Sequence, residues 1–177
     1  MVADAGGGAA VPHVVFLCTG NAARSVMAGA MLGHLDAELR ITTAGTHVIE
    51  GQPMSWRTRD AMGALGYAAP RHRSRQLTDV HVEDADIVVA LAVEHVTYVR
   101  RTHPEAAWRT GTLRRLVRDL PGGPAPLADR VRSLSLETVA LEPWEDVADP
   151  AGGEIDDYEA CAKEVESLIL DLAPRVR

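Results

Sequence analysis

Short hydrophobic runs alternate along this chain with longer stretches in which apolar residues recur at helical spacing. The runs that predict strands are 13–18, 41–44 and 86–91, with a weaker candidate at 137–141. The stretches that predict helices are 25–39, 55–65, 93–101 and 154–172. Strands that alternate with helices indicate an α/β fold. We therefore expect a single α/β domain with a four-stranded parallel sheet flanked by helices.

The last predicted helix has one continuous apolar face. Its members are Tyr158, Cys161, Val165, Leu168, Ile169 and Leu172. Such a face closes a hydrophobic core, so we interpret Cys161 as a packed small hydrophobic residue.

The length of the chain favours one domain. With 177 residues, of which 46% are hydrophobic, it is long enough for one substantial core and too short for two domains of ordinary size. Residues 1–11 are rich in glycine and alanine, and we expect a flexible N-terminal tail there. This stretch has neither the basic start nor the long apolar core of a signal peptide or a membrane anchor. The domain is expected to span residues 12–177.

Charge and cysteine content restrict the partners and the compartment. The 25 acidic residues outnumber the 18 lysines and arginines, and the net charge of −7 argues against non-specific binding to nucleic acid or to an anionic membrane. Cys18 and Cys161 lie far apart in the sequence and provide neither a disulfide framework nor a metal-ligand cluster. We therefore expect a cytoplasmic protein without a metal site.

The candidate chemistry lies in the loop between the first predicted strand and the first predicted helix. This loop begins with the thiol of Cys18 and carries the guanidinium of Arg24 near its end. Its other members are Thr19, Gly20, Asn21, Ala22, Ala23 and Ser25. Unpaired backbone N–H groups at a helix start bind an oxyanion and favour thiolate over thiol, and a guanidinium adds a planar charged fork. We expect a phosphate-binding loop in which Cys18 is the nucleophile.

Three residues of the loop suit this role. Gly20 permits a close approach, Asn21 tolerates a left-handed backbone, and Ser25 can cap the helix or donate its hydroxyl to the thiolate. The stretch VVFLCTGNAARSVMAGAML resembles the signature of the low-molecular-weight protein-tyrosine phosphatases, a superfamily that also contains thiol-dependent arsenate reductases. The resemblance implies a phosphomonoester hydrolase that forms a phosphocysteine on Cys18 and needs no cofactor.

The same chemistry needs a carboxyl group, first to protonate the leaving group and then to activate water. The candidate is Asp149, which is followed by Pro150 just before the last predicted helix. An aspartate before a proline is, by itself, usually a turn residue. In the family that the loop resembles, an Asp-Pro pair near the C-terminus carries the general acid, and the resemblance implies this role for Asp149. Asp146 is the nearest competitor, but no proline follows it.

The resemblance extends to the middle of the chain. Residues 42–46 are similar to the end of the family's second strand, and residues 72–78 are similar to its His-x-x-x-Gln-Leu segment. The resemblance implies that Thr43 and His72 form hydrogen bonds with Asn21 and Ser25 of the loop. The loop would then need no reorganisation when charge develops.

The sequence departs from the family pattern around the loop. Ala23 replaces a second cysteine that is common before the arginine, and Ala92 replaces an aspartate that steadies the arginine, with Glu94 as a candidate substitute. Ala151 replaces an aromatic residue after the Asp-Pro pair, and residues 47–50 contain no aromatic wall. Because a phenyl ring binds best to flat apolar partners, these changes weaken the case for phosphotyrosine or favour smaller phosphoesters.

We nevertheless expect a protein-tyrosine phosphatase that acts on a tyrosine-phosphorylated protein or on a small aryl phosphate. Two alternatives stay open: an arsenate reductase that uses an external thiol, and a non-catalytic module that binds phosphate or a phosphopeptide. Trp56 is interpreted as a core residue, with a substitute for the missing aromatic wall as the alternative. The arginine-rich stretch 100–118 is interpreted as solvated helix surface, with phosphoprotein docking as the alternative. The oligomeric state is left open.

Overall fold

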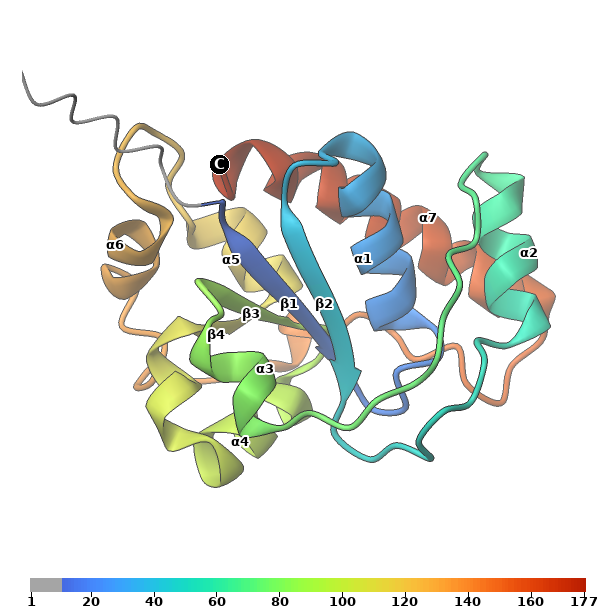
Figure 1. The fold of residues 1–177 in the computed structure, drawn as a ribbon, viewed down its shortest axis with the longest axis horizontal. Helices are drawn as coiled ribbons and strands as arrows, with labels where there is room; N and C mark the ends of the chain where they lie inside the picture. The colour runs from blue at the N-terminus through green and yellow to red at the C-terminus, as the bar shows by residue number, and fades with distance from the viewer. Residues whose placement is uncertain (1–10) are drawn as a thin grey trace, which may run out of the picture.

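Four parallel strands form one sheet in the order β2-β1-β3-β4 in the computed structural model, which describes residues 11–177 (Figure 1). Their bounds are β1 His13–Cys18, β2 Arg40–Gly45, β3 Ile87–Ala90 and β4 Thr110–Thr112. In the central strand β1 every residue is buried, as expected for a parallel strand that is covered on both faces. The predicted N-terminal tail lies, apart from Val11, outside the described residues.

Helices cover both faces of the sheet. The α-helices are α1 Arg24–Leu35, α2 Trp56–Ala64, α3 Asp79–Glu83, α4 Val93–Thr102, α5 Leu113–Asp119, α6 Leu127–Arg132 and α7 Ile155–Leu172. Short 3-10 helices are η1 Pro104–Arg109, η2 Pro143–Glu145 and η3 Ala173–Arg175. No helix within residues 11–177 is long and apolar enough to cross a membrane.

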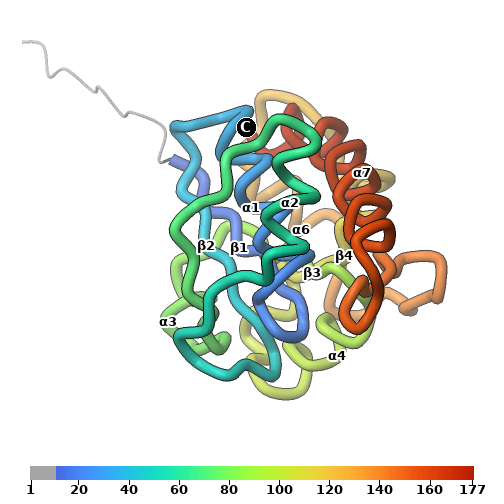
Figure 2. Tube along the Cα trace, turned by 90° about the vertical axis from the view of Figure 1, so that its right-hand side faces the viewer, coloured from blue at the N-terminus to red at the C-terminus, as the bar shows by residue number. Residues whose placement is uncertain are grey.

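The alternation of side chains along β1 divides the core into two layers. Val14, Phe16 and Cys18 face the larger layer, which includes residues of α1, α5 and α7. Val15 and Leu17 face the smaller layer, which is covered by α3, α4 and η1. Helix α7 packs against α1, α2 and α5 and closes the larger layer, as its apolar face predicts (Figure 2).

The fold class is confirmed, but the predicted position of the fourth strand is wrong. Strand β4 is Thr110–Thr112, and its threonine hydroxyls bond inside the protein, where Thr110 donates to the Ala106 carbonyl at 2.8 Å. This short polar strand has no hydrophobic pattern to reveal it. Residues 137–141 form no strand; instead, the carbonyls of Val139 and Ala140 accept hydrogen bonds from arginine side chains.

Glu145 anchors the segment that leads to Asp149. Its side chain is 0% exposed and accepts hydrogen bonds from the Thr112 hydroxyl at 2.7 Å and from Arg115 Nε at 2.9 Å. Burial by itself would raise the pKa of this carboxyl, but the bonds from Arg115 and Thr112 outweigh burial and lower it. Two residues further on, the Val147 N–H donates to the Leu91 carbonyl at 2.9 Å. The segment is therefore tied to the carboxyl ends of β3 and β4.

Arg115 and Arg100 correct the interpretation of the stretch 100–118 as solvated surface. Arg115 is buried against Glu145, and Arg100 donates to the carbonyls of Leu136 and Val139 at 2.6 and 2.8 Å. Both guanidiniums hold the chain between α6 and η2 in place, so they are structural groups.

We predict that Glu145→Gln lowers the free energy of unfolding by about 3 kcal/mol, because the buried Arg115 loses its buried carboxylate partner and keeps only the ion pair with Asp119 at 3.5 Å. Asp84→Asn is the control: Asp84 pairs with Arg40 at 3.2 Å, both side chains are exposed, and the loss of this pair should cost less than about 1 kcal/mol. Urea unfolding at neutral pH measures both values. Equal losses in the two variants would contradict the anchoring role of Glu145.

Candidate active site

The loop from Cys18 to Ser25 joins the end of β1 to the start of α1, as the sequence predicts. Asn21 has φ of 50°, which is the left-handed conformation expected of it. No side chain caps the start of α1 at Ala23, so the N–H groups of the first helical turn are left to bind a ligand. The loop can therefore bind an oxyanion.

Gly45, at the end of β2, forms the floor under this loop. A Cβ at this position would lie 2.5 Å from the Thr19 carbonyl oxygen and 2.9 Å from the Asn21 nitrogen. Both distances are shorter than van der Waals contact, so only glycine lets the strand approach the loop this closely. Gly45 thus determines where the loop backbone lies.

The Cys18 thiol is held by a short chain of hydrogen bonds. Its Sγ lies 3.0 Å from the Ser25 hydroxyl, and Asn21 Nδ2 donates to the same hydroxyl oxygen at 3.0 Å. Because the serine oxygen accepts from Asn21, its own proton is free to point at the sulfur. In this arrangement the Ser25 hydroxyl can donate a hydrogen bond to the Cys18 sulfur.

Arg24 connects the loop to the segment that carries Asp149. Its guanidinium is almost completely buried and donates from Nη2 to Asp149 Oδ2 at 2.6 Å and from Nη1 to the Val147 carbonyl at 3.1 Å. Charge-assisted hydrogen bonds of this length are among the strongest in proteins. The structure thus brings together Cys18, Arg24 and Asp149, although 125 residues separate the last two.

Asp146, the competing carboxylate, is engaged elsewhere. Its Oδ1 accepts from the Val93 N–H at 2.7 Å, at the start of α4. There it satisfies one of the unpaired donors of that helix. Asp149, in contrast, is 43% exposed and pairs with Arg24 of the loop.

Of the two residues expected to hold the loop, only His72 contacts it through a hydrogen bond. His72 Nε2 lies 2.6 Å from the Asn21 carbonyl, so this nitrogen carries the proton, while burial lowers the pKa of the ring. The neighbouring Arg75 N–H donates to Asn21 Oδ1 at 3.0 Å. Thr43 bonds neither Asn21 nor Ser25; its methyl group packs against α1 at Gly29.

Thr58 is a support that the sequence did not reveal. This residue is completely buried in the first turn of α2, and its hydroxyl donates to the Ala22 carbonyl at 3.0 Å. Its backbone N–H bonds the Ser55 hydroxyl, which caps the helix. The cap pattern Ser-x-x-Thr is visible in the sequence, but it does not indicate that α2 starts beside the loop.

A second missed group surrounds the Thr19 hydroxyl. This hydroxyl donates to Glu94 Oε1 at 3.2 Å and lies 3.0 Å from His95 Nε2 and 3.4 Å from Arg24 Nη2. Glu94 and Arg24 therefore share the Thr19 hydroxyl as a hydrogen-bond partner, and within residues 11–177 they form no direct ion pair.

His95 is a neutral group in this cluster. It is 1% exposed, and its Nδ1 has no hydrogen-bond partner among the described residues. Burial, and then the nearby Arg24 charge, lower the pKa of His95 to about 3. The ring therefore supports Thr19 at neutral pH without adding charge next to the phosphate site.

The other cysteine, Cys161, is a buried thiol on α7. Burial raises its pKa to about 12, so this sulfur stays protonated and is a poor nucleophile. This agrees with its interpretation as a packed hydrophobic residue. Ala23 provides no second thiol within the loop.

Comparison with known proteins identifies the class. Residues 13–177 match the family described as low molecular weight phosphotyrosine protein phosphatase, and the chain belongs to this family. The resemblance seen in the sequence is thus confirmed, and the chain is a phosphatase of this family.

The relatives divide by substrate. A protein-arginine-phosphatase from Geobacillus stearothermophilus is 31% identical over 166 residues, covering 93% of this chain and 96% of the relative. A low molecular weight protein-tyrosine-phosphatase from Streptomyces coelicolor is 32% identical over 175 residues, covering 93% of each chain. Among solved structures, the YwlE arginine phosphatase from Geobacillus stearothermophilus has a TM-score of 0.74 and 31% identity, covering 92% of this chain and 90% of that one. The family is shared, and the substrate residue differs.

We predict that His95→Gln flattens the dependence of stability on pH. The unfolded histidine binds a proton near its ordinary pKa of 6.5, whereas the folded one does so only near 3, so folding stability is lost as pH falls through this range. Between pH 7 and pH 5 this group should remove about 2 kcal/mol of unfolding free energy in the wild type and nothing in His95→Gln. Urea unfolding at both pH values provides the measurement. Identical pH slopes in the two proteins would be inconsistent with a buried neutral His95.

Proposed function

We propose that this phosphatase removes phosphoryl groups from phosphorylated protein side chains through a phosphocysteine on Cys18. The observation that carries the proposal is the buried Arg24, which joins the loop of the thiol to the carboxylate of Asp149 at 2.6 Å. Nucleophile, oxyanion clamp and acid thus stand together in one site. These are the groups that the reaction requires.

The reaction has two steps that protein groups can perform. In the first, the Cys18 thiolate attacks phosphorus, the bond from phosphorus to the leaving group breaks, and Asp149 donates a proton to the leaving group. In the second, Asp149 takes a proton from water, the water oxygen attacks phosphorus, and the S–P bond breaks. The products are inorganic phosphate, the thiolate and a protonated Asp149, which is ready for the next turnover.

Arg24 changes partners during this cycle. In the ligand-free site its guanidinium binds Asp149. A phosphoryl group in the loop presents two oxygens to the same fork and takes the place of the carboxylate. Substrate binding then frees the Asp149 carboxylate from Arg24, so that this group can take up a proton from solvent and donate it to the leaving group.

Phosphotyrosine is the first candidate substrate. Trp56, which the sequence predicts in the core, is instead 54% exposed at the first residue of α2. The next residue, Arg57, pairs with Glu154 at 3.6 Å, so Trp56 lies where α2 meets the segment that follows Asp149. An exposed indole at this position offers the flat apolar partner that Ala151 lacks.

Phosphoarginine is the second candidate, and a specific observation favours it. Glu94 is 68% exposed beside Thr19, so a second carboxylate faces the entrance of the phosphate loop. A guanidinium leaving group gains from a nearby carboxylate, whereas a phenol does not. The protein-arginine-phosphatase from Geobacillus stearothermophilus among the relatives supports this candidate.

Arsenate reduction and non-catalytic phosphate binding have less support. An arsenate reductase needs a thiol to complete the reduction, and the raised pKa of Cys161 makes this sulfur unsuitable, so only an external thiol would serve. A non-catalytic phosphate-binding module would not need a thiol poised by Ser25 and Asn21.

We predict that Cys18→Ser lowers kcat for p-nitrophenyl phosphate at least about 1,000-fold, because a serine hydroxyl is a far weaker nucleophile in this loop. Cys161→Ser, the control, should retain activity within about threefold because its sulfur takes no part in the chemistry.

We predict that Asp149→Ala lowers kcat about 100-fold for a tyrosyl phosphate and less for p-nitrophenyl phosphate, whose leaving group needs no proton. Steady-state phosphate release measures these rates. Wild-type activity equal to that of Cys18→Ser would overturn the proposal.

The substrate residue is tested with matched peptides that carry either phosphotyrosine or phosphoarginine. We expect a higher kcat/KM for phosphotyrosine, and we expect Trp56→Ala to lower this value about tenfold. Glu94→Gln should lower turnover of the phosphoarginine peptide more than that of the phosphotyrosine peptide. A wild-type preference for phosphoarginine would replace the first candidate with the second.

A further inference from the structure

Three arginines on one extended segment have no partner in the described part of the chain. Arg71, Arg73 and Arg75, here called the arginine ridge, are all exposed, and their side chains form neither an ion pair nor a hydrogen bond within residues 11–177. They lie between the end of α2 and the start of α3, on the segment that passes the outer side of β2 (Figures 1 and 2). This contrasts with Arg100 and Arg115, whose guanidiniums donate hydrogen bonds inside the protein.

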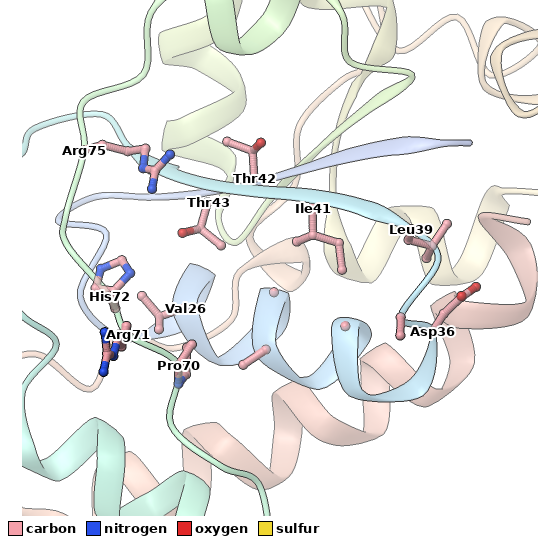
Figure 3. Close-up of a pocket in the computed structure, with 14 residues that line it drawn as sticks. Val26, Asp36, Leu39, Ile41, Thr42, Thr43, Pro70, Arg71, His72 and Arg75 are labelled. Atoms are coloured by element: carbon pink, nitrogen blue, oxygen red, sulfur yellow. The ribbon is translucent and has the colours of Figure 1, made fainter. Parts of the chain in front are cut away.

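A cavity lies on each side of this segment. The first, of about 440 Å³, lies between α1 and the edge of β2, and Arg71 and Arg75 stand at its rim on either side of His72 (Figure 3). The second, of about 660 Å³, is lined by Arg59, Arg71 and Arg73. Arg59 is also exposed. A ligand on the ridge would thus find positive charge on both sides.

The edge of β2 offers backbone hydrogen bonds to the same ligand. Gly45, at the end of the strand, forms its backbone hydrogen bonds on the side that faces away from β1. Its N–H donates to the Arg75 carbonyl, and its carbonyl accepts from the Leu77 N–H. Because bonding directions alternate along a parallel strand, Thr43 and Ile41 direct their N–H and C=O groups to the same outer side. Both residues line the first cavity. An extended peptide can therefore continue the pairing that Arg75 and Leu77 begin.

The positive charge of the arginine ridge favours an acidic peptide. The chain carries a net charge of −7, yet the ridge places three arginines within five residues. In an extended segment these side chains span about 13 Å, at roughly 3.3 Å per residue. A run of acidic residues in an extended peptide matches both this spacing and this charge.

The ridge is continuous with the phosphate loop. The Arg75 N–H and His72 Nε2 hold Asn21 of the loop at 3.0 and 2.6 Å, and Gly45, which bonds Arg75, pairs with Cys18 in the sheet. The ridge therefore begins at the level of the nucleophile. A peptide bound along it can extend into the site.

We propose that the arginine ridge docks an acidic, extended segment of the phosphoprotein substrate beside its phosphorylated residue. This proposal rests on the proposed function, because it names the partner of the same site. It adds a second contact area outside the catalytic groups, which a small aryl phosphate does not reach.

The test uses the full chain and two readouts. Fluorescence anisotropy measures binding of a dye-labelled, unphosphorylated peptide with a run of glutamates, against the same peptide with glutamines. Phosphate release gives kcat/KM for phosphopeptides with the same two flanks. We expect the glutamate peptide to bind about tenfold more tightly at low salt, and this advantage to decrease as salt rises. The kcat/KM of the phosphopeptide with the glutamate flank should exceed that of the glutamine peptide by a similar factor, mainly through a lower KM.

Arg71→Gln combined with Arg73→Gln should remove most of this advantage in both readouts. Arg101→Gln is the matched control, because Arg101 is also exposed but lies on α4. p-Nitrophenyl phosphate turnover on the same preparations shows separately whether the enzyme is active. Equal binding of the two peptides, or an advantage that survives in the ridge variant, would overturn the docking proposal whether or not turnover occurs. Stronger competition by an oligonucleotide or by anionic phosphatidylserine vesicles than by the acidic peptide would also overturn it.

Discussion

The ion pair between Arg24 and Asp149 is the interaction on which this site depends. It joins two segments that are 125 residues apart, at an Nη2 to Oδ2 distance of 2.6 Å, and it places the carboxylate of Asp149 next to the phosphate loop. Because the guanidinium is buried, it needs such a partner when no phosphate is bound. The pair can form only because the buried Glu145 and the bond from Val147 to Leu91 hold the Asp149 segment against the ends of β3 and β4. Much of the second half of the fold thus serves to position one carboxylate.

The phosphate loop itself is held in advance of substrate binding. His72 and the Arg75 N–H bond Asn21, the Thr58 hydroxyl bonds Ala22, and Gly45 lies directly beneath. Donors that are already oriented stabilise a developing negative charge without the cost of reorganisation. His95 also helps to hold the loop, since its neutral ring lies within hydrogen-bond distance of the Thr19 hydroxyl. The loop thus places the Cys18 thiol beside a helix start whose N–H groups are held in position.

The parts of the site that are local in sequence could be predicted, and those that depend on long-range packing could not. The loop from Cys18 to Ser25 follows one strand and opens one helix, so its chemistry is visible in eight consecutive residues. Asp149 was preferred over Asp146 only through the family's Asp-Pro pair, because no local pattern indicates that Asp146 binds the start of α4. Thr58 and His95 were missed because nothing local indicates that α2 and α4 start beside the loop. Strand β4 was missed because its buried hydroxyls look polar in the sequence.

The central claim is that phosphoryl transfer passes through the sulfur of Cys18, and trapping that intermediate tests it most directly. Asp149→Ala slows the attack of water on the phosphocysteine more than it slows its formation from a substrate with a good leaving group. Rapid acid quench after mixing this variant with p-nitrophenyl phosphate, followed by peptide mass spectrometry, should find a phosphoryl group on the peptide that contains Cys18, and none there when Cys18→Ala is added. Turnover by the wild type without any adduct on Cys18, or with the adduct on another residue, would contradict the account.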